Sequence, residues 1–152
     1  MPRRSRPAGR PASPARPSVV RTVARWLLAG LLVFAGVSHL SWGRRGFRIA
    51  VPDWVASDRA GKDVVVVTSG IAEVLLGTAT AVAPERERRR VGAAVAAFFV
   101  AVFPGNVHHW RSGRPVPFMR TDRARFLRLF LQPVLVAWAL WSTGPAASRR
   151  AS

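Results

Sequence analysis

The sequence predicts an all-α integral membrane protein, folded as a four-helix bundle. Apolar residues make up 49% of the chain and gather in four blocks instead of being spread along it. The arginines lie almost wholly between these blocks, and the six tryptophans lie near the block ends. Because a helix of about 20 apolar residues crosses a hydrocarbon layer of roughly 30 Å, each block is predicted to be one span.

The chain begins with a basic segment, residues 1–18, made of Pro, Arg, Ser and Ala without an apolar period. Such a segment cannot bury enough apolar surface to fold, so we expect a disordered arm. Its arginines suit either a signal that keeps the N-terminus in the cytoplasm or a patch for anionic lipid headgroups, and the first role is favoured. A short basic tail is expected at residues 144–152.

The transmembrane domain is predicted over residues 19–143, with four spans. The first span follows a basic region that is too long for a secretory signal peptide, and no small-residue cleavage site follows it, so an uncleaved helix is expected. The last two spans are short and are expected to have little tilt. The predicted spans are about residues 23–40, 64–83, 91–107 and 126–142.

The connections between the blocks predict the topology. Only the segment PERERRR (84–90) separates the second block from the third, which indicates a tight hairpin, whereas the connections 41–63 and 104–125 are long and share the opposite side. Positive charge close to the spans favours cytoplasmic N- and C-termini in a multi-pass protein of the cell (inner) membrane. The tryptophans then form two interfacial belts, Trp26, Trp138 and Trp141 on one side and Trp42, Trp54 and Trp110 on the other.

Composition also excludes several functions. The net charge of +17 suggests a nucleic-acid binder, but the basic residues flank hydrophobic segments instead of forming one folded face, so no nucleic-acid partner is expected. The absence of cysteine excludes thiol–disulfide chemistry and a cluster held by the chain's own thiolates. No metal site is predicted. His108 and His109 are adjacent, so on a helix they point about 100° apart and make a poor chelating pair. A bis-histidine haem held by His39 and one of them is also disfavoured.

Glu73 is the one acidic residue inside any predicted span. A carboxyl group at that depth costs roughly 2.5–3.5 kcal/mol, so it needs a partner, a proton or a water cavity. Gly70 and Gly77 lie one turn on either side on the same helix face, where they allow another helix to approach closely. A second small-residue stripe for helix packing is predicted in the third span, at Ala93, Ala97 and Ala101.

Other polar residues gather towards the long connections. His39 ends the first block, Asn106 ends the third, and Arg128 and Gln132 share a face of the fourth. Together with Glu73 they are predicted to line a polar pocket suited to a quinone headgroup, a proton or a small polar ligand. The alternative is a buried ion pair and hydrogen-bond network that fixes the helix register, and the residues alone weight the two alternatives equally.

Five motifs in order resemble the DoxX family of small four-helix membrane proteins, and the resemblance covers residues 23–141. The motifs are AGVSHL (35–40), VPDWV (51–55), SGIAEVLLG (69–77), FPGNVHHW (103–110) and RLFLQPVLVAWAL (128–140). The resemblance implies a bundle in the inner or cytoplasmic membrane that is linked to oxidoreductase systems, including quinone-coupled sulfur oxidation. It carries the family pattern onto His39, Pro52, Glu73, Gly77, Pro104, Asn106, Arg128 and Gln132.

The first functional hypothesis is a membrane subunit of a redox system, partnered by a membrane-associated oxidoreductase, with a quinone as the candidate cofactor. Glu73 accepts or relays a proton and Arg128 sets its charge, while the remaining three residues, Asn106, Gln132 and His39, hydrogen-bond the ligand. The alternative is a non-catalytic membrane scaffold in which the same residues fix the register. A small transporter or proton channel is disfavoured, because a monomer of four helices needs an oligomer or a partner to form a pore. No catalytic residue is assigned.

Overall fold

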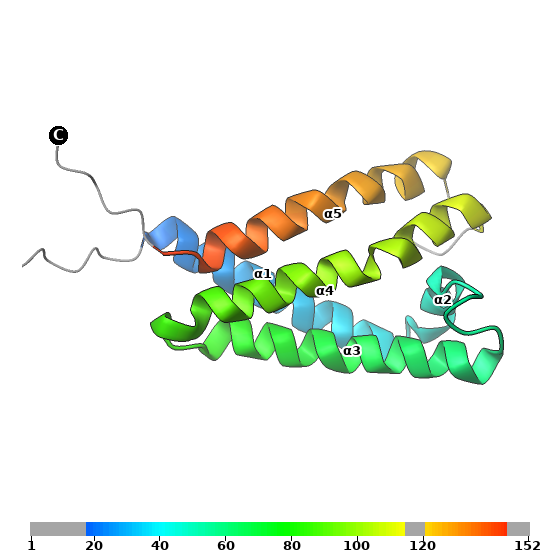
Figure 1. Ribbon diagram of the computed structural model, residues 1–152, viewed down its shortest axis with the longest axis horizontal. Coiled ribbons are helices and arrows are strands. Elements are labelled where there is room, and N and C mark those ends of the chain that lie inside the picture. Colours follow the sequence, from blue (N-terminus) through cyan, green and yellow to red (C-terminus); the bar gives the residue numbers. More distant parts are fainter. Residues whose placement is uncertain (1–17, 115–120, 146–152) are drawn as a thin grey trace, which may run out of the picture.

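The computed structural model describes residues 18–114 and 121–145. Its four long helices are α1 (Val19–Leu40), α3 (Arg59–Val82), α4 (Glu85–Ser112) and α5 (Asp122–Thr143). The connection between α1 and α3 holds a short helix, α2 (Arg44–Phe47), and a 3-10 turn, η1 (Arg48–Ala50). No strand occurs in these two described ranges. The predicted all-α four-helix bundle is therefore confirmed, with the start of α1 and the end of α5 at one end and α2 at the other (Figure 1).

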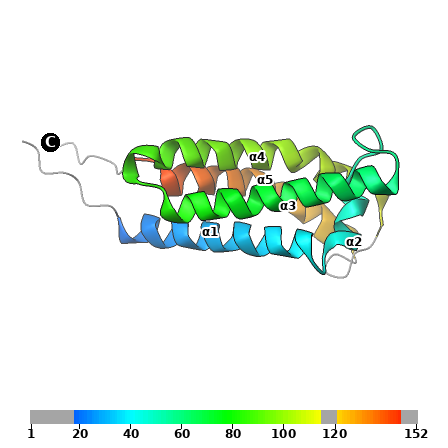
Figure 2. The same ribbon diagram turned by 90° about the horizontal axis from the view of Figure 1, so that it is seen from below.

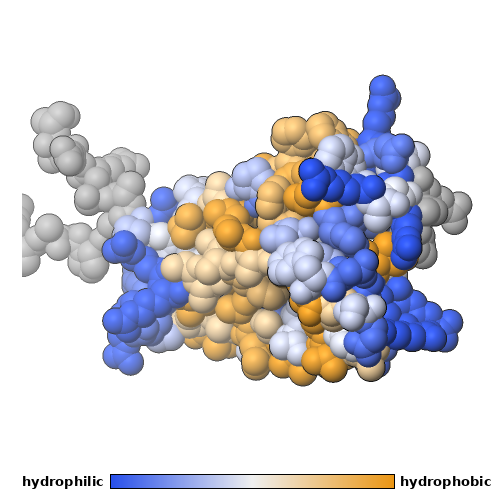
Figure 3. All heavy atoms as spheres, turned by 45° about the vertical axis from the view of Figure 1, so that its right-hand side comes forward, coloured by the Kyte–Doolittle hydropathy of each residue, from blue (hydrophilic) through white to orange (hydrophobic). Residues whose placement is uncertain are grey.

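All four long helices are long and apolar enough to cross a membrane. Apolar side chains form a band across the middle of the molecule, and hydrophilic residues gather at its two ends (Figure 3). Large apolar side chains such as Phe34 and Leu75, each 64% exposed, lie on the outside. Lipid solvates such side chains as well as a protein core does. The chain is a multi-pass membrane protein.

The helices extend beyond the predicted apolar blocks. Most of the predicted hairpin 84–90 forms the first turn of α4, where Glu85 and Glu87 face the positive end of the helix macrodipole. The predicted long connection 104–125 is corrected, because α4 continues through Pro104 to Ser112. A proline removes only one helical hydrogen bond, and the neighbouring residues of a membrane helix tolerate that loss. The predicted arm and tail lie outside the described residues, apart from Ser18, Gly144 and Pro145.

The bundle consists of two helix pairs, α1 with α3 and α4 with α5, which share the most extensive helix contacts. The views from two sides agree that α1 lies alongside α3 (Figures 1 and 2). The pairs meet around an apolar core formed by Leu28, Leu32, Val95, Ala96, Phe99 and Ala139. Towards the α2 end of the bundle this core gives way to buried polar residues, among them Glu73 and Asn106.

Glycines hold α1 and α3 at a short separation. A Cβ atom added at Gly36 would lie 2.5 Å from the Gly70 carbonyl oxygen, and one added at Gly70 would lie 2.8 Å from the His39 Cβ atom. A Cβ atom at Gly77 would similarly lie 2.9 Å from the Ala29 carbonyl oxygen. These contacts leave no room for a side chain, so the two backbones pack directly on each other.

The predicted packing stripe on the third span is wrong. Ala93, Ala97 and Ala101 are exposed on α4, whereas Gly92 and Phe99 belong to its buried face. The Thr143 side chain of α5 occupies the position that a Cβ atom of residue 92 would take, so α5 packs on the face of α4 that contains Gly92. Small residues lie on both faces of α4, so their spacing alone does not reveal which face meets α5.

Arginines in the first turns of α1 bind the ends of the neighbouring helices. Arg25 is 6% exposed, and its Nη1 donates to the carbonyl oxygens of Thr80 at 2.7 Å and Ala81 at 2.8 Å. Arg21 donates to the Gly144 carbonyl oxygen at 3.3 Å, beyond the end of α5. The last carbonyls of a helix have no helical donor and lie at the negative end of its dipole, so both contacts are favourable.

Replacing Arg25 with methionine is expected to lower the free energy of unfolding by about 1.5–3 kcal/mol, because two hydrogen bonds to a charged group are lost. The measurement is chemical unfolding in detergent micelles, followed by circular dichroism. Arg89→Met is the matched control, since Arg89 is exposed on α4. An equal loss in both variants would show that the contacts to Thr80 and Ala81 contribute nothing.

Candidate functional site

Glu73 finds its direct partner on the neighbouring helix. The residue is 8% exposed in the middle of α3, and its Oε2 shares a hydrogen bond with Nδ1 of His39 from the end of α1. Gly70 lies one turn before Glu73 and allows α1 to approach closely enough for this bond. The sequence placed both residues in one cluster but suggested an arginine as the partner that reaches the carboxylate.

The connection between α1 and α3 covers the His39–Glu73 pair. The Phe47 ring of α2 meets the His39 ring edge-on, with 3.7 Å between ring centroids. A Cβ atom added at Gly105 of α4 would lie 3.0 Å from the Ala50 carbonyl oxygen, so η1 packs on α4. Sequence reasoning missed Phe47, because a single aromatic residue in a connection between spans has no pattern that marks it.

Two ion pairs fix this cover to α3. Arg48 pairs with Asp63, and the Lys62 Nζ donates to Asp53 Oδ1 at 2.5 Å. The hydrogen bond from Lys62 and its charge lower the pKa of the exposed Asp53 carboxyl, so this carboxyl stays ionised well below neutral pH. The α1–α3 connection is therefore an ordered cover over the polar site.

Arg128 reaches towards the pair from the other half of the bundle. It lies in the second turn of α5, is partly buried, and interacts electrostatically with the Glu73 carboxylate. The carboxylate therefore meets a histidine from α1 and the field of an arginine from α5. The direct hydrogen bond to the carboxylate comes from His39, and the role of Arg128 in setting the charge of Glu73 stays a prediction.

Asn106 and Gln132 form a separate polar pair between α4 and α5, and each is 6% exposed. The Asn106 Nδ2 donates to Gln132 Oε1 at 3.0 Å, and the Gln132 Nε2 donates to the Phe99 carbonyl oxygen at 2.6 Å. The five predicted site residues thus form two hydrogen-bonded pairs, His39–Glu73 between α1 and α3 and Asn106–Gln132 between α4 and α5. Arg128 of α5 is the fifth, and it interacts electrostatically with Glu73. Of the five, Glu73, Asn106 and Gln132 are buried and His39 and Arg128 are partly buried, and the single shared pocket that was predicted did not anticipate this division.

Replacing Asn106 with leucine is expected to lower the free energy of unfolding by about 0.6–1.7 kcal/mol, between the average and the largest value for hydrogen bonds between membrane helices. The double variant Asn106→Leu with Gln132→Leu should lose less than the sum of the single losses, because the first change already breaks the 3.0 Å bond. Unfolding of all three variants in detergent micelles measures this coupling. Strictly additive losses would show that the two amides do not stabilise each other.

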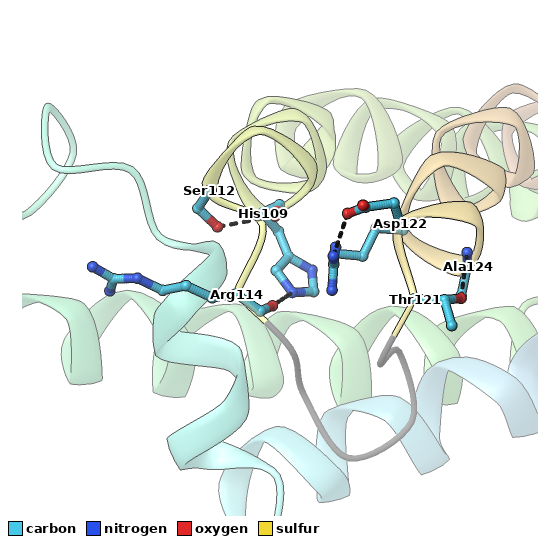
Figure 4. Close-up of polar contacts among 7 residues, drawn as sticks. His109, Ser112, Arg114, Thr121, Asp122 and Ala124 are labelled. Carbon is cyan, nitrogen blue, oxygen red and sulfur yellow. Dashed lines mark hydrogen bonds and ion pairs between the residues drawn. The ribbon is translucent and has the colours of Figure 1, made fainter.

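His109 lies in the last turn of α4, where its contacts are structural. It is 2% exposed, and its Nε2 donates to the Arg114 carbonyl oxygen at 3.1 Å, the carbonyl towards which Figure 4 shows the ring pointing. Its neighbour in that view, Asp122, pairs with Arg125 at the start of α5. The sequence placed His109 in a connection, and only its helical position after Pro104 reveals that it is buried.

In residues 18–114 and 121–145, no group of three His, Asp or Glu side chains is placed to hold a metal ion. The polar site near the α2 end contains three ionisable, hydrogen-bonding side chains: His39, Glu73 and Arg128. They are suited to hold a polar headgroup, and the first two are suited to exchange a proton.

Comparison with known proteins gives one family. A family model described as "Domain of unknown function (DUF8561)" matches residues 28–143, from the middle of α1 to the end of α5. No curated protein and no solved structure matches the chain. The matched region includes the His39–Glu73 pair, Arg128 and the Asn106–Gln132 pair. Because the match covers most of the chain, the protein belongs to the DUF8561 family.

Proposed function

We propose that this protein is a membrane subunit of a redox system and binds a quinone-like or other lipid-soluble ligand beside the His39–Glu73 pair. The observation that carries the proposal is a buried carboxylate paired with a histidine inside the bilayer, with Arg128 acting on it from a different helix. Ionisable residues in membrane spans are costly, and they commonly mark ligand or proton pathways. The resemblance to the DoxX family supports the same assignment.

The chemistry of a quinol suits these groups. Oxidation of a quinol to a quinone releases two electrons and two protons. A membrane-associated oxidoreductase takes the electrons in this proposal, and the His39–Glu73 pair accepts the protons and passes them to water at the nearby membrane surface. The Arg128 guanidinium donates hydrogen bonds to a headgroup oxygen, because it carries only donors.

A scaffold without chemistry is the second candidate. The hydrogen bonds of the Asn106–Gln132 pair and of the His39–Glu73 pair run between helices without any ligand. Buried polar groups that satisfy each other in this way fix helix register in some proteins. A ligand-binding test separates the two candidates, since only the first predicts a bound molecule.

The test uses the full chain in nanodiscs with a short-tailed ubiquinone as the probe and quenching of tryptophan fluorescence as the readout. We expect saturable binding, weakened about tenfold in Glu73→Gln, a loss of about 1.4 kcal/mol. The same loss is expected in Arg128→Gln, while Glu87→Gln, on the partly exposed first turn of α4, serves as the matched control. Absence of saturable binding, or equal binding in folded Glu73→Gln, would refute the redox proposal and favour the scaffold.

We further propose that the protein lies in the cell membrane with both termini in the cytoplasm. The start of α1 and the end of α5 share one end of the bundle with the basic α3–α4 hairpin, which supports this orientation (Figure 1). The chain has no cysteine, so single cysteines report their side without background. An impermeant thiol reagent should label Ser57→Cys in intact cells and Arg86→Cys only after lysis, and the reverse pattern would invert the orientation.

A further inference from the structure

An apolar groove runs along the outside of the bundle, between the first half of α1 and the second half of α5. Its volume is about 710 Å³, and every side chain that lines it is apolar. Its walls include Val20, Val23 and Leu27 from α1 and Val134, Trp138 and Trp141 from α5. The Trp138 Nε1 donates to the Ala24 carbonyl oxygen at 3.1 Å, which ties the two walls together. The lining offers no charged or hydroxyl group to water, so the groove is suited to an apolar occupant in the membrane.

One end of the groove carries positive charge. The Arg21 guanidinium lies 5.7 Å from the centre of the Trp141 ring, and it is held there by its bond to the Gly144 carbonyl oxygen. The arginines of the α3–α4 hairpin lie at the same end of the bundle. The occupant of the groove therefore meets indole rings and cations where the groove reaches the membrane interface.

We propose that this groove is a binding site for an anionic phospholipid, with an acyl chain in the groove and the phosphate against Arg21. The α1 residues that line the groove run from Val19 to Leu27, a length of about 12 Å at the helical rise. The groove is apolar along its whole lining, which suits an extended hydrocarbon chain.

The charge at the groove end also argues against a second copy of the chain. A two-fold interface presents the same surface on both subunits. Two copies with the same membrane orientation would bring Arg21 of each subunit towards Arg21 of the other, and like charges repel. An anionic headgroup, in contrast, gains attraction from each nearby arginine.

The test is native mass spectrometry of the full chain, released from detergent, with phosphatidylglycerol or phosphatidylcholine of identical acyl chains. We expect preferential retention of phosphatidylglycerol and a loss of this preference by about fivefold in Arg21→Gln. Ala137→Phe and Val20→Trp place a ring in the groove and should reduce retention of both lipids. Ala97→Phe adds the same ring at an exposed position of α4 outside the groove and should retain lipid like the unchanged chain.

Equal retention of the two lipids would overturn the assignment of an anionic headgroup. Unchanged lipid retention in both groove-filling variants would overturn the groove as the binding site. A disulfide-linked dimer of Val23→Cys, formed in membranes without added lipid, would show that a second copy occupies the groove. This readout is clean because the natural chain has no cysteine. The redox proposal is unaffected by these outcomes, because the groove lies outside the His39–Glu73 pair.

Discussion

Replacing Gly36 with leucine is expected to separate α1 from α3 and to destabilise the bundle by an amount at the upper end of about 1–3 kcal/mol. A Cβ atom at this position would meet the Gly70 carbonyl oxygen at 2.5 Å and the Val74 backbone nitrogen at 2.9 Å. Both are backbone atoms of a helix, which cannot move aside as a flexible side chain can. Reversible unfolding in detergent micelles, followed by helical circular dichroism, measures the loss.

Gly30→Leu is the matched control for this experiment. Gly30 lies on the same helix, and a Cβ atom added there would meet nothing within 4 Å. Both substitutions raise helix propensity by the same amount, so the difference between the two variants isolates the packing of α1 on α3. Equal stability of Gly36→Leu and Gly30→Leu would contradict the close backbone contact seen at Gly36 and Gly70.

The same substitution tests how the fold positions the site. His39 lies one turn after Gly36, and its bond to Glu73 depends on the short separation of the two helices. Gly36→Leu should therefore also weaken binding of the ubiquinone probe, although Gly36 is not one of the polar side chains proposed to bind it. Gly30→Leu should bind the probe like the unchanged chain.

The four spans were predictable because hydropathy depends on composition and length, which a sequence contains in full. The division of the polar residues into two pairs was not predictable in this way. Five buried or partly buried polar residues near one end of a bundle allow several pairings, and the rotation of each helix selects among them. Here the Gly36–Gly70 contact sets the rotation that turns His39 towards Glu73.

The misassigned packing face of α4 has the same physical origin. Alanines at positions 93, 97 and 101 and the buried face that contains Gly92 are both compatible with close helix packing. Only the position of Thr143 on the facing helix shows that the Gly92 side is the one in contact. The third span was predicted to end near residue 107, whereas α4 continues to Ser112, because hydropathy marks the end of an apolar block and not the end of a helix.

Removal of the Glu73 carboxylate is expected to separate the structural from the functional role of the site. Glu73→Ala leaves the partly buried His39 ring without its partner, so the free energy of unfolding should fall by about 1.5–3 kcal/mol. Glu73→Gln keeps an amide that can hydrogen-bond the ring and should lose less than Glu73→Ala. The measurement is a double-mutant cycle with His39→Ala, in which direct contact predicts a coupling energy of about 0.5–3 kcal/mol.

The glutamine variant distinguishes the two proposed roles of the carboxylate. An amide preserves a hydrogen bond that fixes the register, but it has no negative charge to interact with Arg128 and it does not accept a proton. If the site is a register device, Glu73→Gln should resemble the unchanged chain in every measurement. If the site binds a quinone and exchanges protons, Glu73→Gln should remain folded and lose probe binding. A coupling energy near zero between His39 and Glu73 would contradict both roles, because each requires the hydrogen bond between these two residues.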